Sequence, residues 1–420
     1  MDNPKRAAIL QAMNNSSEIL IVGGGLSGPI LALALARAGH CVTVIDALKE
    51  EPRKAADFDG RSYAVALTSQ RLLDGIGLWD AVADHSRPIL EIKVSDGRAG
   101  EGPSPFFMHF DHAEIEEGPM GHMVQDRHLR RALLEAMAET DGITHLAGET
   151  VTRQTVVGAG VTVTLASGKT LGGAMLIGAD GRGSGTAARA GIKRMGWPYN
   201  QTALVCAIAH EKPHHGIAHQ FFMPSGPLAI LPLPGNVSSI VWSEQTETAA
   251  AFQALPEDAY LTMLRPRFGD FLGDISLAGQ RYSYPLSLSL ATRLVAPRTA
   301  LIGDAAHGVH PIAGQGLNAG MRDIAALAEV ITDATRRGED PGTQAVLARY
   351  EEWRRFDNTA LALATDSFNR LFSNDNALVR GVRDLGMGLV GKLPTLRRSF
   401  IREAAGLTGD LPRLMRGAPL

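Results

Sequence analysis

The chain has 420 residues, of which 45% are hydrophobic and 20% are charged, so it can bury a core large enough for two domains. Its formal net charge of -3 argues against nucleic acid as the main partner. Two cysteines cannot build a disulfide framework, and no run of about 18 apolar residues marks a membrane span. With no apolar signal-peptide core near Met1, we expect a cytoplasmic protein.

A glycine-rich turn near the start of the chain lies between two predicted strands. An apolar stretch leads into Gly23, Gly25 and Gly28, an apolar helical run follows, and a second strand ends in Asp46. In this context Gly23 allows the tight turn, Gly25 lets the backbone approach a pyrophosphate, and Gly28 lets helix and strand pack closely. Asp46 is placed to accept hydrogen bonds from a ribose. The stretch therefore predicts a bound dinucleotide, against the alternative of a glycine-rich turn without a ligand.

Two later stretches repeat the pattern of an apolar strand followed by an acid and a turn. The first ends in Asp180, and the second runs into Gly303 and Asp304 before a helix begins. Between them, residues 200–285 predict strands separated by Pro/Gly turns, and the chain is predicted helical from residue 344 onward. Because the motifs are far apart in the sequence, we expect the cofactor-binding domain to be assembled from distant segments.

The helix after Asp304 offers unpaired backbone N–H groups at its start. Such an N-terminus carries partial positive charge and suits a phosphate, a ribose or an electron-rich ring. Gly314, Gly316 and Gly320 remove side chains where something flat or bulky must touch the backbone. This stretch therefore predicts a second part of the ligand site, with Asp304 as an acceptor carboxylate.

Together the three motifs resemble those of the FAD-dependent aromatic hydroxylases, the single-component class A flavoprotein monooxygenases. Residues 310–318 are similar to the signature of the ubiquinone-biosynthesis hydroxylases within that group. Further matches are residues 60–64 with Leu67, residues 127–129, and residues 226–233 with Trp242. The chain departs from the family at Ala187, where an arginine is usual, although Arg182 and Arg189 flank that position.

The resemblance implies an α/β architecture like that of 4-hydroxybenzoate hydroxylase. A Rossmann-like FAD-binding domain is interleaved with a mixed β-sheet substrate domain, and C-terminal helices follow. The expected FAD-binding domain comprises residues 1–90, 121–195 and 286–345. The expected substrate domain comprises residues 91–120 and the β-rich stretch 196–285, and the expected C-terminal helical region is 346–420.

The resemblance also implies a chemistry. With FAD bound, O2 and electrons from NADH or NADPH would form a flavin C4a-hydroperoxide that hydroxylates a phenol ring, while the protein supplies orientation, electrostatics and exclusion of water. A relay through a reductase is the alternative source of electrons. Pro311, Gly314 and Gln315 are expected beside the flavin, where substrate and oxygen meet. The expected cofactor contacts are Gly23, Gly25, Gly28, Asp46, Arg61, Arg127, Asp180, Gly303, Asp304, Gly314, Gly316, Leu317 and Asn318.

Some of these contacts have implied partners. Asp304 would anchor the ribitol, Asp180 would be shared by FAD and the pyridine nucleotide, and the helix start at Gly314 would favour negative charge on the reduced ring. Arg61 and Arg127 would reach flavin or phosphate oxygens, with solvated surface charges as the alternative.

The expected substrate wall comes from the β-rich stretch. Phe222, Leu228 and Trp242 alternate with small or polar residues and would line an apolar face above the flavin, unless they are ordinary sheet core. A carboxylated soluble phenol would need a dedicated arginine, and none lies between Arg194 and Arg265. We therefore expect a polyprenylated phenol of ubiquinone biosynthesis. A soluble phenolic substrate and, from another class, a flavin-bound scaffold in a quinone-biosynthesis complex are the alternatives.

Two further clusters remain. Four histidines lie within residues 210–219, but Pro213 and Gly216 break any helix that would align them, so no metal is expected. The C-terminal stretch is basic with interleaved apolar residues, which favours peripheral contact with the inner face of a membrane or with a ubiquinone-biosynthesis complex. A homo-oligomer contact is the alternative.

Overall fold

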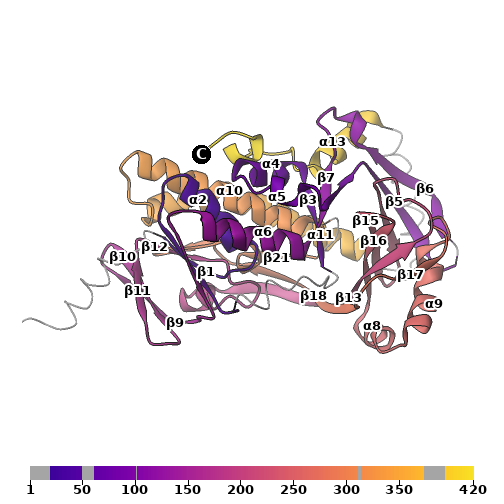
Figure 1. The fold of residues 1–420 in the computed structure, drawn as a ribbon, viewed down its shortest axis with the longest axis horizontal. Coiled ribbons are helices and arrows are strands. Elements are labelled where there is room, and N and C mark those ends of the chain that lie inside the picture. Colours follow the sequence, from indigo (N-terminus) through magenta and orange to yellow (C-terminus); the bar gives the residue numbers. More distant parts are fainter. Residues whose placement is uncertain (1–18, 50–60, 101, 311–313, 373–392) are drawn as a thin grey trace, which may run out of the picture.

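The computed structural model describes residues 19–49, 61–100, 102–310, 314–372 and 393–420. Two large sheets lie toward opposite ends of an elongated molecule, and most of the long helices lie on one side of them (Figure 1).

A six-stranded sheet carries the first glycine-rich turn. Its order is β19-β20-β12-β1-β2-β8, and every neighbouring pair is parallel except the edge pair β19–β20. The four residues of β1 are all buried apolar side chains, as is typical of a parallel strand covered on both faces. Its strands are β1 (Ile19–Val22), β2 (Val42–Asp46), β8 (Ile143–Ala147), β12 (Met175–Gly178), β19 (Val295–Ala296) and β20 (Thr299–Leu301).

Helices from both ends of the chain share one apolar core with this sheet. The helices are α2 (Ser27–Arg37), α4 (Leu67–Gly75), α5 (Asp80–Ala83), α6 (Asp126–Glu139), α7 (Gly185–Arg189), α10 (Gln315–Arg336) and α11 (Gln344–Phe372). Leu414 and Met415 of the short helix η4 (Arg413–Arg416) are buried in the same core, so the end of the chain packs against its beginning.

A nine-stranded mixed sheet forms the other half of the molecule. Its order is β21-β18-β13-β16-β15-β14-β5-β6, with β17 paired to β13. Helices α8 (Thr246–Gln253) and α9 (Glu257–Phe268) pack on one face, and α13 (Pro394–Ala404) packs near β6. Its strands are β5 (Glu91–Arg98), β6 (Gly102–Asp111), β13 (Arg194–His210), β14 (Ile217–Met223), β15 (Gly226–Leu233), β16 (Val237–Gln245), β17 (Ile275–Leu277), β18 (Tyr282–Ala291) and β21 (His307–Gly308).

Two three-stranded sheets complete the fold. One is β11-β10-β9 and the other is β3-β7-β4. Their strands are β3 (Ser62–Ala66), β4 (Ser86–Ile89), β7 (Gly121–Gln125), β9 (Val151–Val157), β10 (Gly160–Leu165) and β11 (Thr170–Gly173), and the short helices η1 (His112–Glu114) and η2 (Gly303–Ala305) lie between strands. The predicted fold class is confirmed: a Rossmann-like sheet and a mixed β-sheet alternate along the chain, and helices follow. The domain boundaries stay a prediction.

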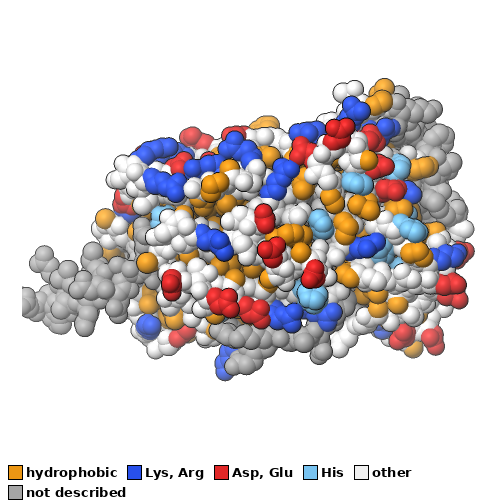
Figure 2. All heavy atoms as spheres, turned by 45° about the horizontal axis from the view of Figure 1, so that its top comes forward, with side chains coloured by type: hydrophobic (Ala, Val, Ile, Leu, Met, Phe, Trp, Pro, Cys, Tyr) orange, Lys and Arg blue, Asp and Glu red, His pale blue; other side chains and the backbone are white. Residues whose placement is uncertain are grey.

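The surface mixes charges of both signs. On the face drawn in Figure 2, basic, acidic and apolar side chains are interspersed, and neither sign of charge covers that face alone. Among the described helices, none is both long and apolar enough to cross a membrane.

Candidate functional site

The turn between β1 and α2 needs glycine at two positions because of close contacts. A Cβ on Gly23, whose φ is +115°, would lie 2.3 Å from the carbonyl oxygen of Ala179, and a Cβ on Gly28 would lie 1.9 Å from that of Gly23. A Cβ on Gly25 would meet nothing within 4 Å. The turn is therefore closed against the sheet at Gly23 and Gly28 and open at Gly25. That open backbone at the start of a helix suits a phosphate.

Asp46 lies against this turn, at the end of β2. Its side chain is buried, and its Oδ1 accepts a hydrogen bond from the Leu48 backbone N–H at 3.2 Å. A Cβ on Gly24 would lie 2.3 Å from Asp46 Oδ2, so the carboxylate touches the turn directly. This is the placement that a ribose acceptor needs beside a dinucleotide turn.

The Asp180 carboxylate organises its own loop. It accepts hydrogen bonds from the Thr186 N–H and hydroxyl, both at 2.9 Å, and from the Ser184 hydroxyl at 2.5 Å. These donors lie at the start of α7, so the Asp180 side chain holds the loop before α7 in place. Arg182 and Arg189 flank Ala187, the position where an arginine is usual in the family. Arg189 donates to Gln154 and Thr186, and Arg182 donates to Asp304.

The loop around Asp304 meets both earlier motifs. Arg182 Nε donates to Asp304 Oδ2 at 3.1 Å, and the Asp304 side chain is 49% exposed. Gly303 has a φ of +57°, and a Cβ there would lie 2.7 Å from the hydroxyl oxygen of Ser27 in α2. The structure thus brings together three motifs that are spread over more than half of the chain.

The N-terminus of α10 begins at Gly314, in a left-handed conformation with a φ of +64°. No side chain in the described part of the chain caps this helix start, and its first turn holds no acid. Gln315, Gly316 and the partly buried Leu317 form that first turn. Pro311 lies outside the described residues, so its expected place beside the flavin stays a prediction.

The Asn318 side chain is fully hydrogen-bonded within the protein. Its Oδ1 accepts from the Ala66 N–H and the Ser69 hydroxyl, both at 2.9 Å, and its Nδ2 donates to the carbonyl oxygens of Ala64 at 2.8 Å and Gly314 at 3.0 Å. These four bonds use the full hydrogen-bonding capacity of the amide. The side chain therefore joins α10 to β3 and α4, and the expected cofactor contact at Asn318, through backbone N–H groups of the helix start, stays a prediction.

Arg61 and Arg127 lie close together, where β3 and α6 begin, and their contact with the cofactor stays a prediction. Arg61 Nη2 is 3.3 Å from Asp126 Oδ2, and Arg127 Nε donates to Gln125 Oε1 at 2.8 Å. Asp126 also accepts from the Tyr63 hydroxyl at 2.8 Å. Burial and the neighbouring Asp126 raise the pKa of Tyr63 above its usual range, so the phenol stays a donor. Sequence reasoning missed Asp126, because its acceptor role joins two segments that lie more than 60 residues apart.

The sequence matches the family described as an FAD-binding domain over residues 16–362. It is 48% identical over 407 residues to the ubiquinone hydroxylase UbiL of Rhodospirillum rubrum, a match that covers 96% of this chain and 94% of that one. It is 33% identical to the 3-demethoxyubiquinol 3-hydroxylase of Escherichia coli, covering 94% and 100% of the two chains. The chain belongs to the FAD-dependent ubiquinone-biosynthesis hydroxylases. Its predicted family is confirmed, and FAD is its cofactor.

The fold of this family member is also seen in solved structures. The p-nitrophenol 4-monooxygenase PnpA from Pseudomonas putida superposes with a TM-score of 0.77 at 19% sequence identity, covering 94% of this chain and 98% of that one. At this identity the likeness establishes a shared fold only.

The predicted substrate wall is wrong at two of its three positions. Leu228 and Trp242 pair across β15 and β16, and both are fully buried on the face that α8 and α9 cover. Trp242 donates from Nε1 to Glu244 at 3.1 Å, and Arg267 lies 4.9 Å above its ring. These two side chains are sheet core, because side chains alternate between the faces of a strand and theirs point away from the cofactor motifs.

Phe222 lies on the opposite face of the same sheet. It packs in a cluster with Met123 of β7 and Ile401 of α13, and Ala64 borders that cluster. Because the carbonyl of Ala64 accepts from Asn318 in α10, this face adjoins the helix start of the cofactor site. Phe222 therefore lies on the sheet face that adjoins α10, and its place above the flavin and its contact with substrate stay predictions.

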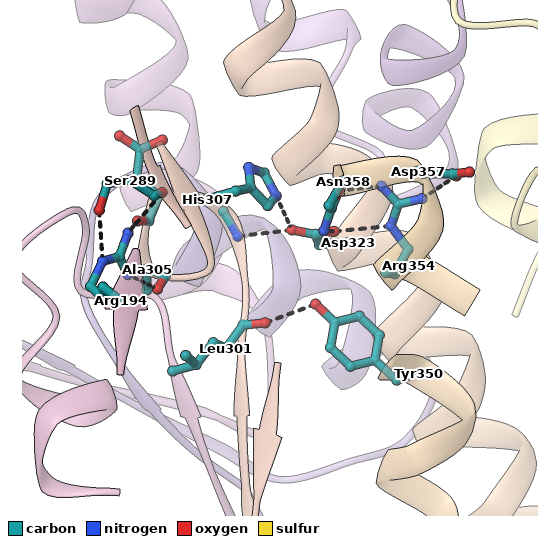
Figure 3. Close-up of polar contacts among 12 residues, drawn as sticks. Arg194, Ser289, Leu301, Ala305, His307, Asp323, Tyr350, Arg354, Asp357 and Asn358 are labelled. Atoms are coloured by element: carbon teal, nitrogen blue, oxygen red, sulfur yellow. Dashed lines mark hydrogen bonds and ion pairs between the residues drawn. The ribbon is translucent and has the colours of Figure 1, made fainter. Parts of the chain in front are cut away.

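Arg194 holds the Asp304 loop from the side of β13 (Figure 3). Its Nη2 donates to the carbonyl oxygen of Asp304 at 3.1 Å, its Nε donates to the Ser289 hydroxyl at 2.9 Å, and its Nη1 donates to the carbonyl of Ala305. Burial lowers the pKa of Arg194, and the nearby Asp304 carboxylate opposes that shift. Sequence reasoning missed this role because the contact spans 110 residues and belongs to no single motif.

Proposed function

We propose that this protein hydroxylates the aromatic ring of a polyprenylated ubiquinone precursor, using O2 and electrons from NADH or NADPH. The observation that carries the proposal is the meeting of the open turn at Gly25, the Asp304 loop and the α10 N-terminus in a member of this family. When bound, FAD supplies the activation of O2 and the transfer of one oxygen atom to the ring.

The residues of the chain divide the work of holding the cofactor. The backbone at Gly25 and the start of α2 would hold the pyrophosphate, Asp46 the adenosine ribose, and Asp304 the ribitol. The α10 N-terminus at Gly314 would place backbone N–H groups and its dipole against the pyrimidine edge of the ring, which stabilises negative charge there. Pro311 and Gln315 would border the place where substrate and O2 meet, and Arg61 and Arg127 would reach flavin or phosphate oxygens.

The chemistry of the sheet supports an apolar substrate. Phe222 lies in an apolar cluster on the cofactor side of the sheet. Arg194 is already engaged with Ser289 and the Asp304 loop, so it does not offer a free fork to a substrate carboxylate. A polyprenylated phenol without a carboxylate fits these surroundings better than a soluble phenolic acid.

The first test is a quinone profile of cells that lack the gene, by lipid extraction and mass spectrometry. We expect loss of ubiquinone and accumulation of a polyprenylated phenol that lacks one oxygen, with recovery on expression of the parent chain but not of a Gly25→Val variant. An unchanged ubiquinone pool, together with NADH or NADPH oxidation triggered by soluble phenolic acids in the purified holoenzyme, would identify the soluble-phenol alternative instead.

We also propose that α13 contacts an anionic membrane surface. Leu396 and Phe400 are exposed on this helix beside Arg398 and Arg402, while Ile401 anchors it to the sheet. Apolar side chains flanked by arginines are typical of helices that lie at a lipid interface. A Phe400→Ser variant should float less with phosphatidylglycerol vesicles, whereas Val156→Ser on the distant strand β9 should behave like the parent. Concentration-dependent dimers abolished by Phe400→Ser, without vesicle binding, would show a homo-oligomer contact instead.

A further inference from the structure

A buried cluster of titratable side chains adjoins the loop from Gly303 to His307 (Figure 3). Its members are Asp323 of α10, Arg354 of α11 and His307 of β21, whose side chains are between 0% and 2% exposed. None of the three belongs to the motifs that predicted the cofactor site. Ionised groups so deeply buried are expensive unless they are paired and fully hydrogen-bonded.

Asp323 is the centre of this cluster. Its Oδ2 accepts from the Gly303 backbone N–H at 3.1 Å and lies 2.5 Å from His307 Nε2. Its Oδ1 accepts from Arg354 Nε at 2.9 Å and from Asn358 Nδ2 at 3.2 Å. Each oxygen therefore serves one side: Oδ2 holds both ends of the loop from Gly303 to His307, and Oδ1 faces α11.

Arg354 completes the connection to α11. Its Nη1 donates to Asp357 Oδ2 at 2.6 Å, and its Nη2 donates to Asn358 Oδ1 at 2.9 Å. One turn earlier, the Tyr350 hydroxyl donates to the carbonyl oxygen of Leu301 at 2.8 Å. Helix α11 thus holds the strand that enters the loop through Tyr350, and the loop itself through Arg354 and Asp323.

The charge state of the cluster follows from its contacts. Burial alone would raise the pKa of Asp323, but His307 and Arg354 more than offset it and hold that pKa at about 2. The carboxylate is therefore ionised near neutral pH. Arg354 supplies a planar fork of donors, which one ammonium group cannot reproduce.

The cluster does not face the cofactor itself. Its three side chains are closed off from the surface, whereas the Asp304 side chain, on the same loop, is half exposed. Asp323 bonds directly to both ends of the loop from Gly303 to His307, so an effect of Asp323 on FAD can pass through that loop as well as along α10. Asp304 is therefore a group that would touch the cofactor, whereas Asp323 is a group that would position such a contact.

We propose that Asp323 and Arg354 are positioning residues for FAD: the buried pair fixes the backbone at Gly303 and thereby the direction of the Asp304 carboxylate. The inference rests on the proposed role of Asp304 as the ribitol contact. It extends control of FAD retention to α11, a helix outside every cofactor motif of the chain.

The experiment measures the rate of FAD release from the holoenzyme, by the rise of free-flavin fluorescence after dilution. In Asp323→Asn an NH2 group, which is a donor, replaces one of the two acceptor oxygens. It would face the donors at Gly303 and His307 in one orientation of the amide, and those at Arg354 and Asn358 in the other. We expect release at least tenfold faster than in the parent. Arg354→Lys keeps the charge without the fork and should give an intermediate rate, which provides a second measurement if Asp323→Asn does not fold.

Asp340→Asn is the matched control. Asp340 also pairs with an arginine, Arg298, at 2.6 Å and accepts from a glycine backbone N–H, that of Gly342, at 2.9 Å. It lies by Ala174 and Arg298, at the amino ends of β12 and β20, whereas the Asp180 and Asp304 motifs follow the carboxyl ends of these strands. We expect this variant to release FAD within twofold of the parent rate, even if its thermal stability falls.

A double variant separates positioning from general stability. If Asp323 acts through Asp304, the double variant Asp323→Asn/Asp304→Ala should release FAD no faster than Asp304→Ala alone. Two results would overturn the inference. One is a double variant in which the rate increases of the two single variants multiply, and the other is release from Asp323→Asn as slow as from Asp340→Asn. Unchanged release from Asp304→Ala with fast release from Asp323→Asn would instead overturn the ribitol assignment in the proposed function and leave Gly303 as the positioned group.

Discussion

Replacing Asn318 by alanine should destabilise the junction between α10, β3 and α4. The amide of Asn318 makes four hydrogen bonds there, with Ala64, Ala66, Ser69 and Gly314. Each contributes about 1 kcal/mol net, and its partners are left without that bond in the variant, so we expect a loss of about 4 kcal/mol. For a chain of 420 residues this corresponds to a fall in Tm of roughly 5 °C.

The assay is thermal unfolding of the holoenzyme by calorimetry, with FAD release recorded in the same scan. Asn236→Ala is a matched control, because Asn236 is exposed and its side chain donates one hydrogen bond, to Glu211 at 3.1 Å. The control should change stability by no more than about 0.5 kcal/mol. A loss below about 1 kcal/mol for Asn318→Ala would refute the reasoning, since water would then have replaced the four bonds.

Three further outcomes are expected. Gly25→Val should leave a folded protein that retains no FAD. Gly28→Ala should instead lower the free energy of unfolding, because its Cβ would lie 1.9 Å from a carbonyl oxygen. Flavin absorbance reports FAD retention and circular dichroism reports folding, so the two measurements on both variants separate these effects. Trp242→Ala should cost about 3–5 kcal/mol of stability without a change in the KM for the phenol, and a raised KM at intact stability would restore it to the substrate wall. The depressed pKa of Asp323, about 2, should contribute about 2 kcal/mol that is present above pH 4 and is lost as the pH falls from about 4 to 2; acid unfolding of Asp323→Asn should lack this loss.

Local patterns in the sequence predicted the cofactor turn. The features that those patterns missed depend on contacts between residues far apart in the sequence. Gly23 and Gly28 could be recognised because strand, turn and helix follow one another directly. Period-2 alternation at Leu228 and Trp242 predicted a strand, but it does not say which face meets α8 and α9. Three of the four hydrogen bonds of the Asn318 amide join residues about 250 positions earlier, so no short motif indicates them.

The buried ion cluster shows the same limit from another direction. Asp323 and Arg354 each stand in an ordinary helical stretch, where charged residues are usually expected on the solvated face. Their pairing depends on how α10 and α11 pack, a contact that spans 31 residues. Only the packed helices show that these charges are buried.

The strand order of the six-stranded sheet also has a consequence for folding during synthesis. β1 lies between β2 and β12, β12 pairs with β20, and Leu414 and Met415 fill the same core. Since a chain leaves the ribosome N-terminus first, β1 can pair with β2 early but can pair with β12 only after more than 150 further residues are made, and the core also needs Leu414 and Met415 of η4. Chains truncated before η4 should therefore expose part of this apolar core, aggregate and retain less FAD than the parent chain.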